Sequence, residues 1–192
     1  MKKFQIITFA FIFISILSCT ENETEEVIEE QTSNIEKNTV LSTDNTGILN
    51  YFSFVKGDLQ TGTVFSITAF EKMPTLTNSD TGNSILFYFK EVPTTSTTLT
   101  HFGGFDVNAT QFFVSNVELN GKKWYTPFVG DDPTGELKIT IENEIATFTV
   151  EEIELSDNFI NPITETKKIS FSVSVATSYF SSHNTGFVDL SN

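Results

Sequence analysis

Arginine is absent from the 192 residues, and cysteine occurs once, at Cys19. A single thiol excludes an internal disulfide and a cysteine-based metal site. Without arginine, the chain also lacks the planar fork that binds phosphate or carboxylate through two hydrogen bonds. The two histidines, His101 and His183, are far apart, and neither has a second ligand residue two to four positions away. This spacing excludes the local zinc motifs, and we expect no metal or cofactor.

Positive charge is scarce as well. The chain has 11 basic residues, all lysine, against 25 acidic ones, for a formal charge of -14. Nucleic acids and anionic lipid surfaces attract basic patches, so this balance excludes nucleic acid as an expected partner. The two lysine pairs, Lys122-Lys123 and Lys167-Lys168, are each flanked by strand-like sequence. We interpret both as solvated strand faces.

The N-terminus carries the one long apolar run. Met1-Lys2-Lys3 precedes an apolar stretch from Phe4 to Leu17, which is shorter than the roughly 20 residues of a membrane-spanning helix. This pattern predicts a signal peptide over residues 1–18. Ser18 before Cys19 resembles the lipobox of bacterial lipoproteins, in which the cysteine carries lipid. The resemblance implies lipid attachment at Cys19 and an outer-membrane anchor, and the alternative is an ordinary secretory signal that contains a cysteine.

Residues 19–40 are rich in Glu, Thr, Asn and Gln, with Lys37 as the only lysine. Such a segment cannot bury a core, and we expect a flexible acidic linker. Acidic residues after the lipidated cysteine also resemble the signal that sends some lipoproteins of Bacteroidota-type bacteria to the cell surface. A spacer that only improves solubility is the alternative, so either the cell surface or the periplasmic face remains open.

Residues 41–192 are predicted to form one all-β domain. The clearest pattern is the alternation of apolar and hydroxyl side chains from Ile169 to Val175, which predicts a strand with one buried face. Other expected strands span residues 48–55, 63–70, 84–91, 97–102, 111–119, 137–141 and 146–155. Many short strands without helical periodicity favour an antiparallel β-sandwich, with a partly open β-barrel as the alternative.

Local signals add detail to this domain. Asn120-Gly121 predicts a two-residue type I′ hairpin turn that pairs Val117 with Trp124 and Glu118 with Lys123. Trp124 then faces the core, and Tyr125 faces outward as a candidate for stacking on a sugar. The alternation changes phase at Glu151-Glu152, which predicts a β-bulge. We expect Lys56-Gly57-Asp58 to turn the first pair of strands.

Candidate chemical groups are few. His101 precedes Phe102-Gly103-Gly104, a weak likeness to an esterase oxyanion loop, but no Gly-x-Ser-x-Gly motif accompanies it. Asp131 and Asp132 could offer oxygen ligands to Ca²⁺, although a turn explains the same residues without a metal. We therefore assign no catalytic residue and keep Tyr125 and His101 as possible ligand-binding residues.

The order of these features resembles small Bacteroidota-type outer-membrane lipoproteins with an all-β domain, a family to which no activity is attached. Two hypotheses of function remain. The first is a lipid-anchored envelope module, binding or structural, whose partner would be a surface protein, glycan or peptide. The second is a hydrolase or lyase that acts on an extracellular polymer through carboxylates such as Asp106, Asp131 and Asp132, brought together by folding.

Overall fold

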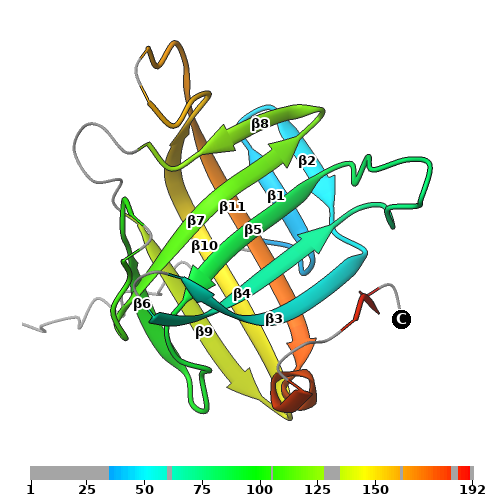
Figure 1. The fold of residues 1–192 in the computed structure, drawn as a ribbon, viewed down its shortest axis with the longest axis vertical. Helices are drawn as coiled ribbons and strands as arrows, with labels where there is room; N and C mark the ends of the chain where they lie inside the picture. Colours follow the sequence, from blue (N-terminus) through cyan, green and yellow to red (C-terminus); the bar gives the residue numbers. More distant parts are fainter. Residues whose placement is uncertain are drawn as a thin grey trace, which may run out of the picture. The chain divides into compact units, whose positions relative to one another are not determined.

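Twelve strands account for most of the chain that the computed structural model describes, namely residues 35–59, 62–104, 106–127, 135–160, 162–182 and 186–190. The prediction of an all-β domain is confirmed. Cys19, Asp131, Asp132, His183, the expected signal peptide and most of the expected linker lie outside the described residues. Figure 1 shows how the strands follow one another. They are β1 (Thr39–Ser42), β2 (Asn45–Ile48), β3 (Tyr51–Leu59), β4 (Gly62–Phe70), β5 (Ser84–Phe89), β6 (Thr97–His101), β7 (Gln111–Leu119), β8 (Lys122–Tyr125), β9 (Glu136–Glu142), β10 (Ile145–Ser156), β11 (Thr166–Ala176) and β12 (Val188–Asp189).

The strands form one hydrogen-bonded path, in the order β12-β3-β4-β5-β7-β6-β9-β10-β11-β1-β2. β8 pairs with both β7 and β10, and this closes a five-strand ring of β6, β7, β8, β9 and β10. The pair β6–β7 is parallel, whereas the other pairs are antiparallel. The structure therefore differs from the expected antiparallel two-sheet sandwich: it is a closed, mixed barrel with further strands outside it.

A bulge in β10 explains how the ring closes. The register of β10 shifts between Val150 and Ile153, at the two glutamates where the sequence predicted a bulge. Before the bulge β10 pairs with β9, and after it Ser156 pairs with Tyr125 of β8. Because a bulge bends a strand and increases its twist, one long strand can serve two neighbours.

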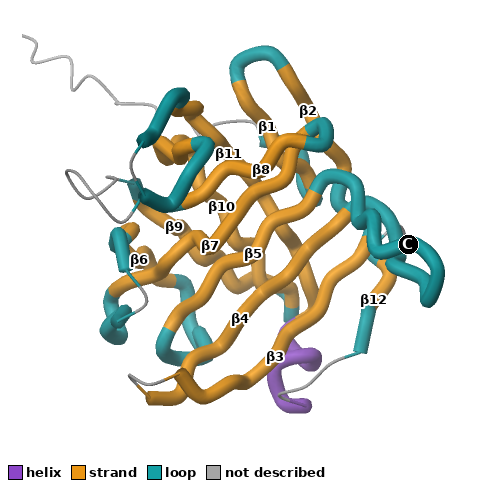
Figure 2. Tube along the Cα trace, turned by 45° about the horizontal axis from the view of Figure 1, so that its top comes forward, coloured by secondary structure: helices purple, strands orange, loops and turns teal. Residues whose placement is uncertain are grey.

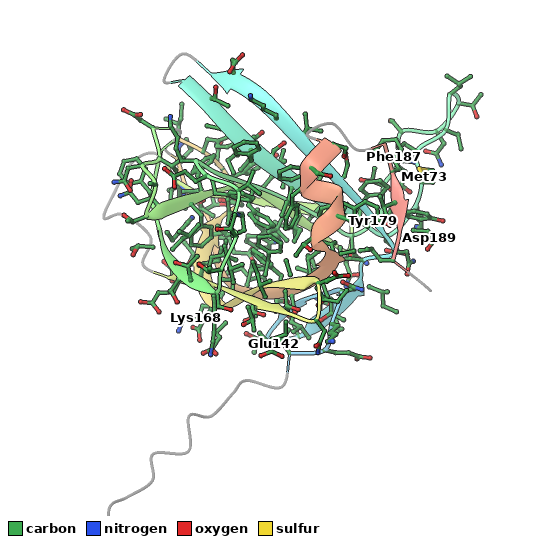
Figure 3. The ribbon with its side chains drawn as sticks, turned by 90° about the horizontal axis from the view of Figure 1, so that it is seen from below. Met73, Glu142, Lys168, Tyr179, Phe187 and Asp189 are labelled. Carbon is green, nitrogen blue, oxygen red and sulfur yellow. The ribbon has the colours of Figure 1, made fainter. Side chains whose placement is uncertain are left out.

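Phenylalanine fills the interior. The alternating residues of successive strands meet in register, and one inward row runs from β3 to β8 through Phe52, Ala69, Ile85, Val117 and Trp124, all nearly fully buried. Phe87 of β5 lies 5.8 Å from Phe148 of β10 and 5.4 Å from Phe171 of β11, measured between ring centroids. Figure 3 shows side chains packed throughout the interior of the domain, while Glu142 and Lys168 lie on its outside. The interior is thus a packed core.

A short 3-10 helix, η1 (Thr177–Ser182), covers the core beside β3 (Figure 2). Its Phe180 ring lies 5.1 Å from the ring of Phe54, and its Tyr179 ring lies 6.4 Å from that of Phe52. These contacts join the chain after β11 to the inward face of β3. The sequence had no periodic signal for so short a helix.

One expected turn is wrong. Lys56, Gly57 and Asp58 lie inside β3, where they pair with Phe65, Val64 and Thr63 of β4. The strand continues to Leu59, and the return strand begins at Gly62, whose φ of 110° suits glycine. β1 also begins at Thr39, two residues before the expected start of the domain at Leu41.

Candidate functional site

A polar pocket of about 350 Å³ lies where the β4–β5 connection meets the β7–β8 turn. Both segments lie at the same end of their strands in Figure 1. Side chains that carry carboxylate, amide or ammonium groups line the pocket, together with two glycines: Glu71, Lys72, Asp80, Gly82, Asn83, Glu118, Asn120 and Gly121. The pocket thus brings several charged side chains together around a sizeable volume.

The β7–β8 turn forms one wall. Asn120 and Gly121 have φ values of 53° and 76°, as the predicted type I′ turn requires. The predicted register is confirmed, since Glu118 pairs with Lys123 and Val117 with Trp124. The Glu118 carboxylate therefore lies on the outward face, 3.7 Å from the Lys123 ammonium.

Asn83 connects the walls of the pocket. Its Nδ2 donates to Glu71 Oε2 at 2.6 Å, and its backbone N donates to the same oxygen at 3.1 Å. Its Oδ1 accepts from the backbone N of Asn120 at 2.9 Å. Asn120 Nδ2 in turn donates to Asn45 Oδ1 of β2 at 2.6 Å. This chain of amides fixes four separate segments around the pocket.

Two glycines make room for this network. A Cβ at Gly47 of β2 would lie 2.5 Å from Asn83 Cγ, and a Cβ at Gly82 would lie 2.7 Å from Glu71 Oε2. Gly82 also has a φ of 66°, which disfavours other residues. The backbone at Gly47 and Gly82 therefore lies so close to the Glu71–Asn83 pair that a larger residue at either position would collide with it.

A lysine lies between two of the carboxylates. Lys72 Nζ is 3.8 Å from Glu71 Oε1 and 3.9 Å from Asp80 Oδ2. The Lys72 and Asp80 side chains are each 56% exposed, whereas that of Glu71 is 29% exposed. Ion pairs this long and this exposed contribute little to stability. The Lys72 ammonium can therefore move away from these two carboxylates at a small cost in free energy.

The predicted ligand-binding residues lie elsewhere. His101 is 4% exposed, and its Nε2 is 3.1 Å from Thr126 Oγ1, which donates to the Val114 carbonyl at 2.6 Å. Because that hydroxyl proton is committed to Val114, His101 Nε2 is the donor of its own hydrogen bond. The imidazole also packs against Phe112 with ring centroids 5.0 Å apart. These contacts describe a histidine of the core.

Tyr125 is half-buried rather than an open platform, because the Phe159 ring lies 4.1 Å from it between centroids. Asp106 is exposed, and it is absent from the lining of the pocket. Within the described ranges, no group of three or more His, Cys, Asp or Glu side chains is arranged to hold a metal ion. No helix in that part of the chain has the length and apolar character that a membrane span requires.

The sequence predicted the residues on one side of the pocket but not those on the other. The Asn-Gly turn and the Glu118–Lys123 pair were predicted, but Glu71, Asp80 and Asn83 were not singled out. The local signal for Asp80 and Asn83 is the turn-rich run from Asn78 to Asn83, in which Asn78 Oδ1 accepts from the backbone N of Asp80, and Glu71 lies outside this run. Comparison with protein families, with curated proteins and with solved structures finds no match to this chain.

Proposed function

We propose that the chain is a lipid-anchored module of the bacterial cell envelope, non-catalytic, that binds a polar ligand at the pocket between Glu71 and Asn120. The observation that carries the binding role is the fixed polar lining of that pocket above a core filled with phenylalanine. A surface pocket whose hydrogen-bonding groups are already held in place loses little entropy when a ligand arrives. Glycans, peptides and surface proteins are the ligand classes to test.

The anchor rests on the sequence pattern before Cys19. A positive start, an apolar run, Ser18 and the cysteine occur in the order that lipoprotein processing needs. Lipoproteins of this type carry two or three acyl chains, and several buried chains give lasting membrane attachment where one gives only marginal binding. The resemblance to Bacteroidota-type lipoproteins favours the outer membrane, with the acidic linker directing the domain to the cell surface or leaving it in the periplasm.

The polymer-cleaving alternative has less support. Of the acids named for it, Asp106 is exposed and away from the pocket, and Asp131 and Asp132 lie outside the described residues. His101, which would support such acids, lies in the core with Thr126 and Phe112 as neighbours. The acids that do converge, Glu71, Asp80 and Glu118, each form an ion pair with Lys72 or Lys123. We therefore favour the binding role over polymer cleavage.

The anchor is tested by metabolic labelling with an alkyne-tagged palmitate in cells that express the full chain. We expect label on the wild-type chain, none on Cys19→Ala, and accumulation of the unprocessed form with globomycin. Ser15→Ala, inside the apolar run, is the control and keeps its label. Normal labelling and processing of Cys19→Ala would contradict the anchor.

The binding role is tested by thermal unfolding of the full chain in mild detergent with a panel of neutral oligosaccharides, acidic peptides and basic peptides. A ligand at 100 times its Kd adds about 2.7 kcal/mol of stability and raises the Tm measurably. We expect a ligand of the pocket to raise the Tm of the wild type but not that of Asn83→Ala. Each shift is measured relative to the Tm of the same protein without ligand. If no class raises the Tm in this pocket-dependent way, the binding role fails.

A further inference from the structure

One side of β3 is open along the second half of the strand. β4 covers the other side, whereas among the described residues no strand pairs with the open side beyond Phe52. We infer that two copies of this chain join through that edge, with β3 of one copy pairing antiparallel with β3 of the other about Gly57. The inference goes beyond the proposed binding role and does not depend on it.

The open edge begins after the contacts of β12 and η1. β12 pairs with Tyr51 and Phe52, and the rings of η1 pack against Phe52 and Phe54. β4, in contrast, pairs with β3 along its whole length. In Figure 2, β3 continues past both β12 and η1 to its turn into β4. Because an open edge presents unpaired N–H and C=O groups, it is a template on which a strand of another chain can add.

The backbone groups of Lys56 and Asp58 point to this open edge. Along a strand of an antiparallel sheet, the N–H and C=O groups of successive residues point alternately to the two sides. The carbonyl of Val55 faces β4, since it accepts a hydrogen bond from Ser66 Oγ at 3.3 Å. Lys56 and Asp58 therefore face the other way, and each offers one backbone donor and one backbone acceptor to an added strand.

These two residues also carry opposite charges on one face of β3, because they are two positions apart. Both side chains are exposed. Lys56 takes part in none of the ion pairs of the described residues. Asp58 Oδ1 accepts from Thr63 Oγ1 at 2.8 Å, which leaves its second oxygen for a cation. The edge thus presents a cation and an anion close together.

Charge selects one register for the pairing of two such edges. Because backbone groups of the same direction must meet, the two-fold centre falls on a residue and not between residues. A centre at Lys56 or at Asp58 would place like charges directly opposite each other, which is destabilising. A centre at Val55 would place Asp58 opposite Phe52, which already pairs with β12. A centre at Gly57 places Lys56 of each copy opposite Asp58 of the other, so the same patch is complementary to itself.

The contact in this register is small and locally neutral. Each Lys56–Asp58 pair exchanges backbone hydrogen bonds in addition to its ion pair. Because the two charges cancel, the edge itself adds no net charge to the repulsion between two acidic chains. A contact of this size gives a reversible dimer, which a covalent cross-link can capture.

The test introduces a cysteine at the two-fold centre of the full chain in mild detergent. Gly57 would face its copy in a non-hydrogen-bonded pair, where Cα atoms lie about 4.5 Å apart, within the roughly 4.4–6.8 Å that disulfides span. Nothing lies within 4 Å of a Cβ at this position, so Gly57→Cys has room for the new side chain. We expect mild oxidation to cross-link Gly57→Cys at least about fivefold more than Thr98→Cys, at an exposed position of β6 between two paired strands. The wild-type chain reports any cross-link through Cys19.

Charge variants built on Gly57→Cys test the register. Lys56→Asp and Asp58→Lys each place like charges opposite each other, and we expect each alone to lower the cross-linked fraction about fivefold. In an equimolar mixture of the two variants, opposite charges face each other again, and the cross-linked fraction should return to within about twofold of the parent. The mixture also controls for folding, since a misfolded variant is not restored by mixing.

Cross-linking of Gly57→Cys no higher than that of Thr98→Cys would overturn the inference. So would equal cross-linking of the parent and both charge variants, or a mixture that stays at the level of its components. The same oxidation is carried out on intact cells that express Gly57→Cys. There, a disulfide to a different protein in place of the dimer would assign the edge to that partner and overturn the inference.

Discussion

At the scale of single residues, one threonine holds a buried polar pair together. Thr126 is fully buried and joins His101 Nε2 to the Val114 carbonyl. Thr126→Val keeps the shape but removes both hydrogen bonds, and a buried polar group that loses its partner costs about 1–3 kcal/mol. We expect the free energy of unfolding in urea to fall by about 2 kcal/mol. The control Thr98→Val, at an exposed position of β6, should change the free energy of unfolding by less than about 0.5 kcal/mol. If both variants lose the same free energy of unfolding, the hydrogen bonds of Thr126 do not stabilise the fold.

Two glycines offer a matched pair of substitutions. In Gly47→Ala the new methyl group would collide with Asn83, while in Gly57→Ala nothing lies within 4 Å. Overpacking of this kind costs about 1–3 kcal/mol, whereas alanine in a strand interior is favoured over glycine by about 0.5–1 kcal/mol. We expect opposite signs in urea denaturation, with Gly47→Ala less stable and Gly57→Ala unchanged or more stable. A tolerated Gly47→Ala would mean that Asn83 can move freely.

Tyr88 predicts how stability depends on alkaline pH. Its ring packs with Val64, Val107 and Phe113 on the outward face of β5, and burial raises the pKa of its hydroxyl above the usual 10.0 despite a hydrogen bond with Ser115. The unfolded chain loses this proton first, so stability is full below about pH 10 and falls as pH rises toward the folded pKa. Tyr88→Phe should flatten the decline of unfolding free energy between pH 9.5 and 11. An identical slope in both proteins would exclude Tyr88 as its source.

At the scale of elements, alternation and turn chemistry are local, and these features were predictable. The inward row through Val117 and Trp124 follows from period-2 alternation together with the Asn-Gly turn. The bulge at Glu151-Glu152 follows from the change of phase. Closure of the ring depends instead on Ser156 meeting Tyr125, 31 positions apart, and the pocket depends on Asn45, Asn83 and Asn120 converging. No local pattern encodes such contacts, because the cost of closing long loops is recovered only by tertiary packing.

The β7–β8 turn can be tested as an element. Gly121 has a φ of 76°, and a non-glycine residue in the left-handed region costs about 1–2 kcal/mol. Since nothing lies within 4 Å of a Cβ at this position, Gly121→Ala isolates the backbone cost from packing. We expect a loss of about 1–2 kcal/mol in unfolding free energy and little change in the emission of the buried Trp124. No loss would mean that the turn relaxes to another type.

At the scale of the whole molecule, net negative charge opposes folding, and surface ion pairs favour it. The described ion pairs, among them Lys122–Glu165, Lys167–Asp44 and Lys168–Glu152, are partly or largely exposed, and exposed ion pairs contribute little to stability. Against them stands a surplus of 14 negative charges, whose mutual repulsion acts over about 30 Å in 0.01 M salt but only about 3 Å in 1 M salt. Salt weakens both the attraction within the ion pairs and the repulsion among the surplus negative charges. The repulsion is weakened more, because it involves more charges over longer distances.

We therefore expect sodium chloride to stabilise the fold. Between 20 and 500 mM, the free energy of unfolding in urea should rise by about 1 kcal/mol, since screening relieves the compact state more than the expanded one. Replacement of Glu142, Glu151 and Glu154 by glutamine should reduce this salt dependence, since these are exposed positions of β9 and β10 that take part in none of the ion pairs of the described residues. If stability falls as salt is added, the ion pairs outweigh the repulsion, and Lys168→Met would then remove more of the salt dependence than the triple variant does.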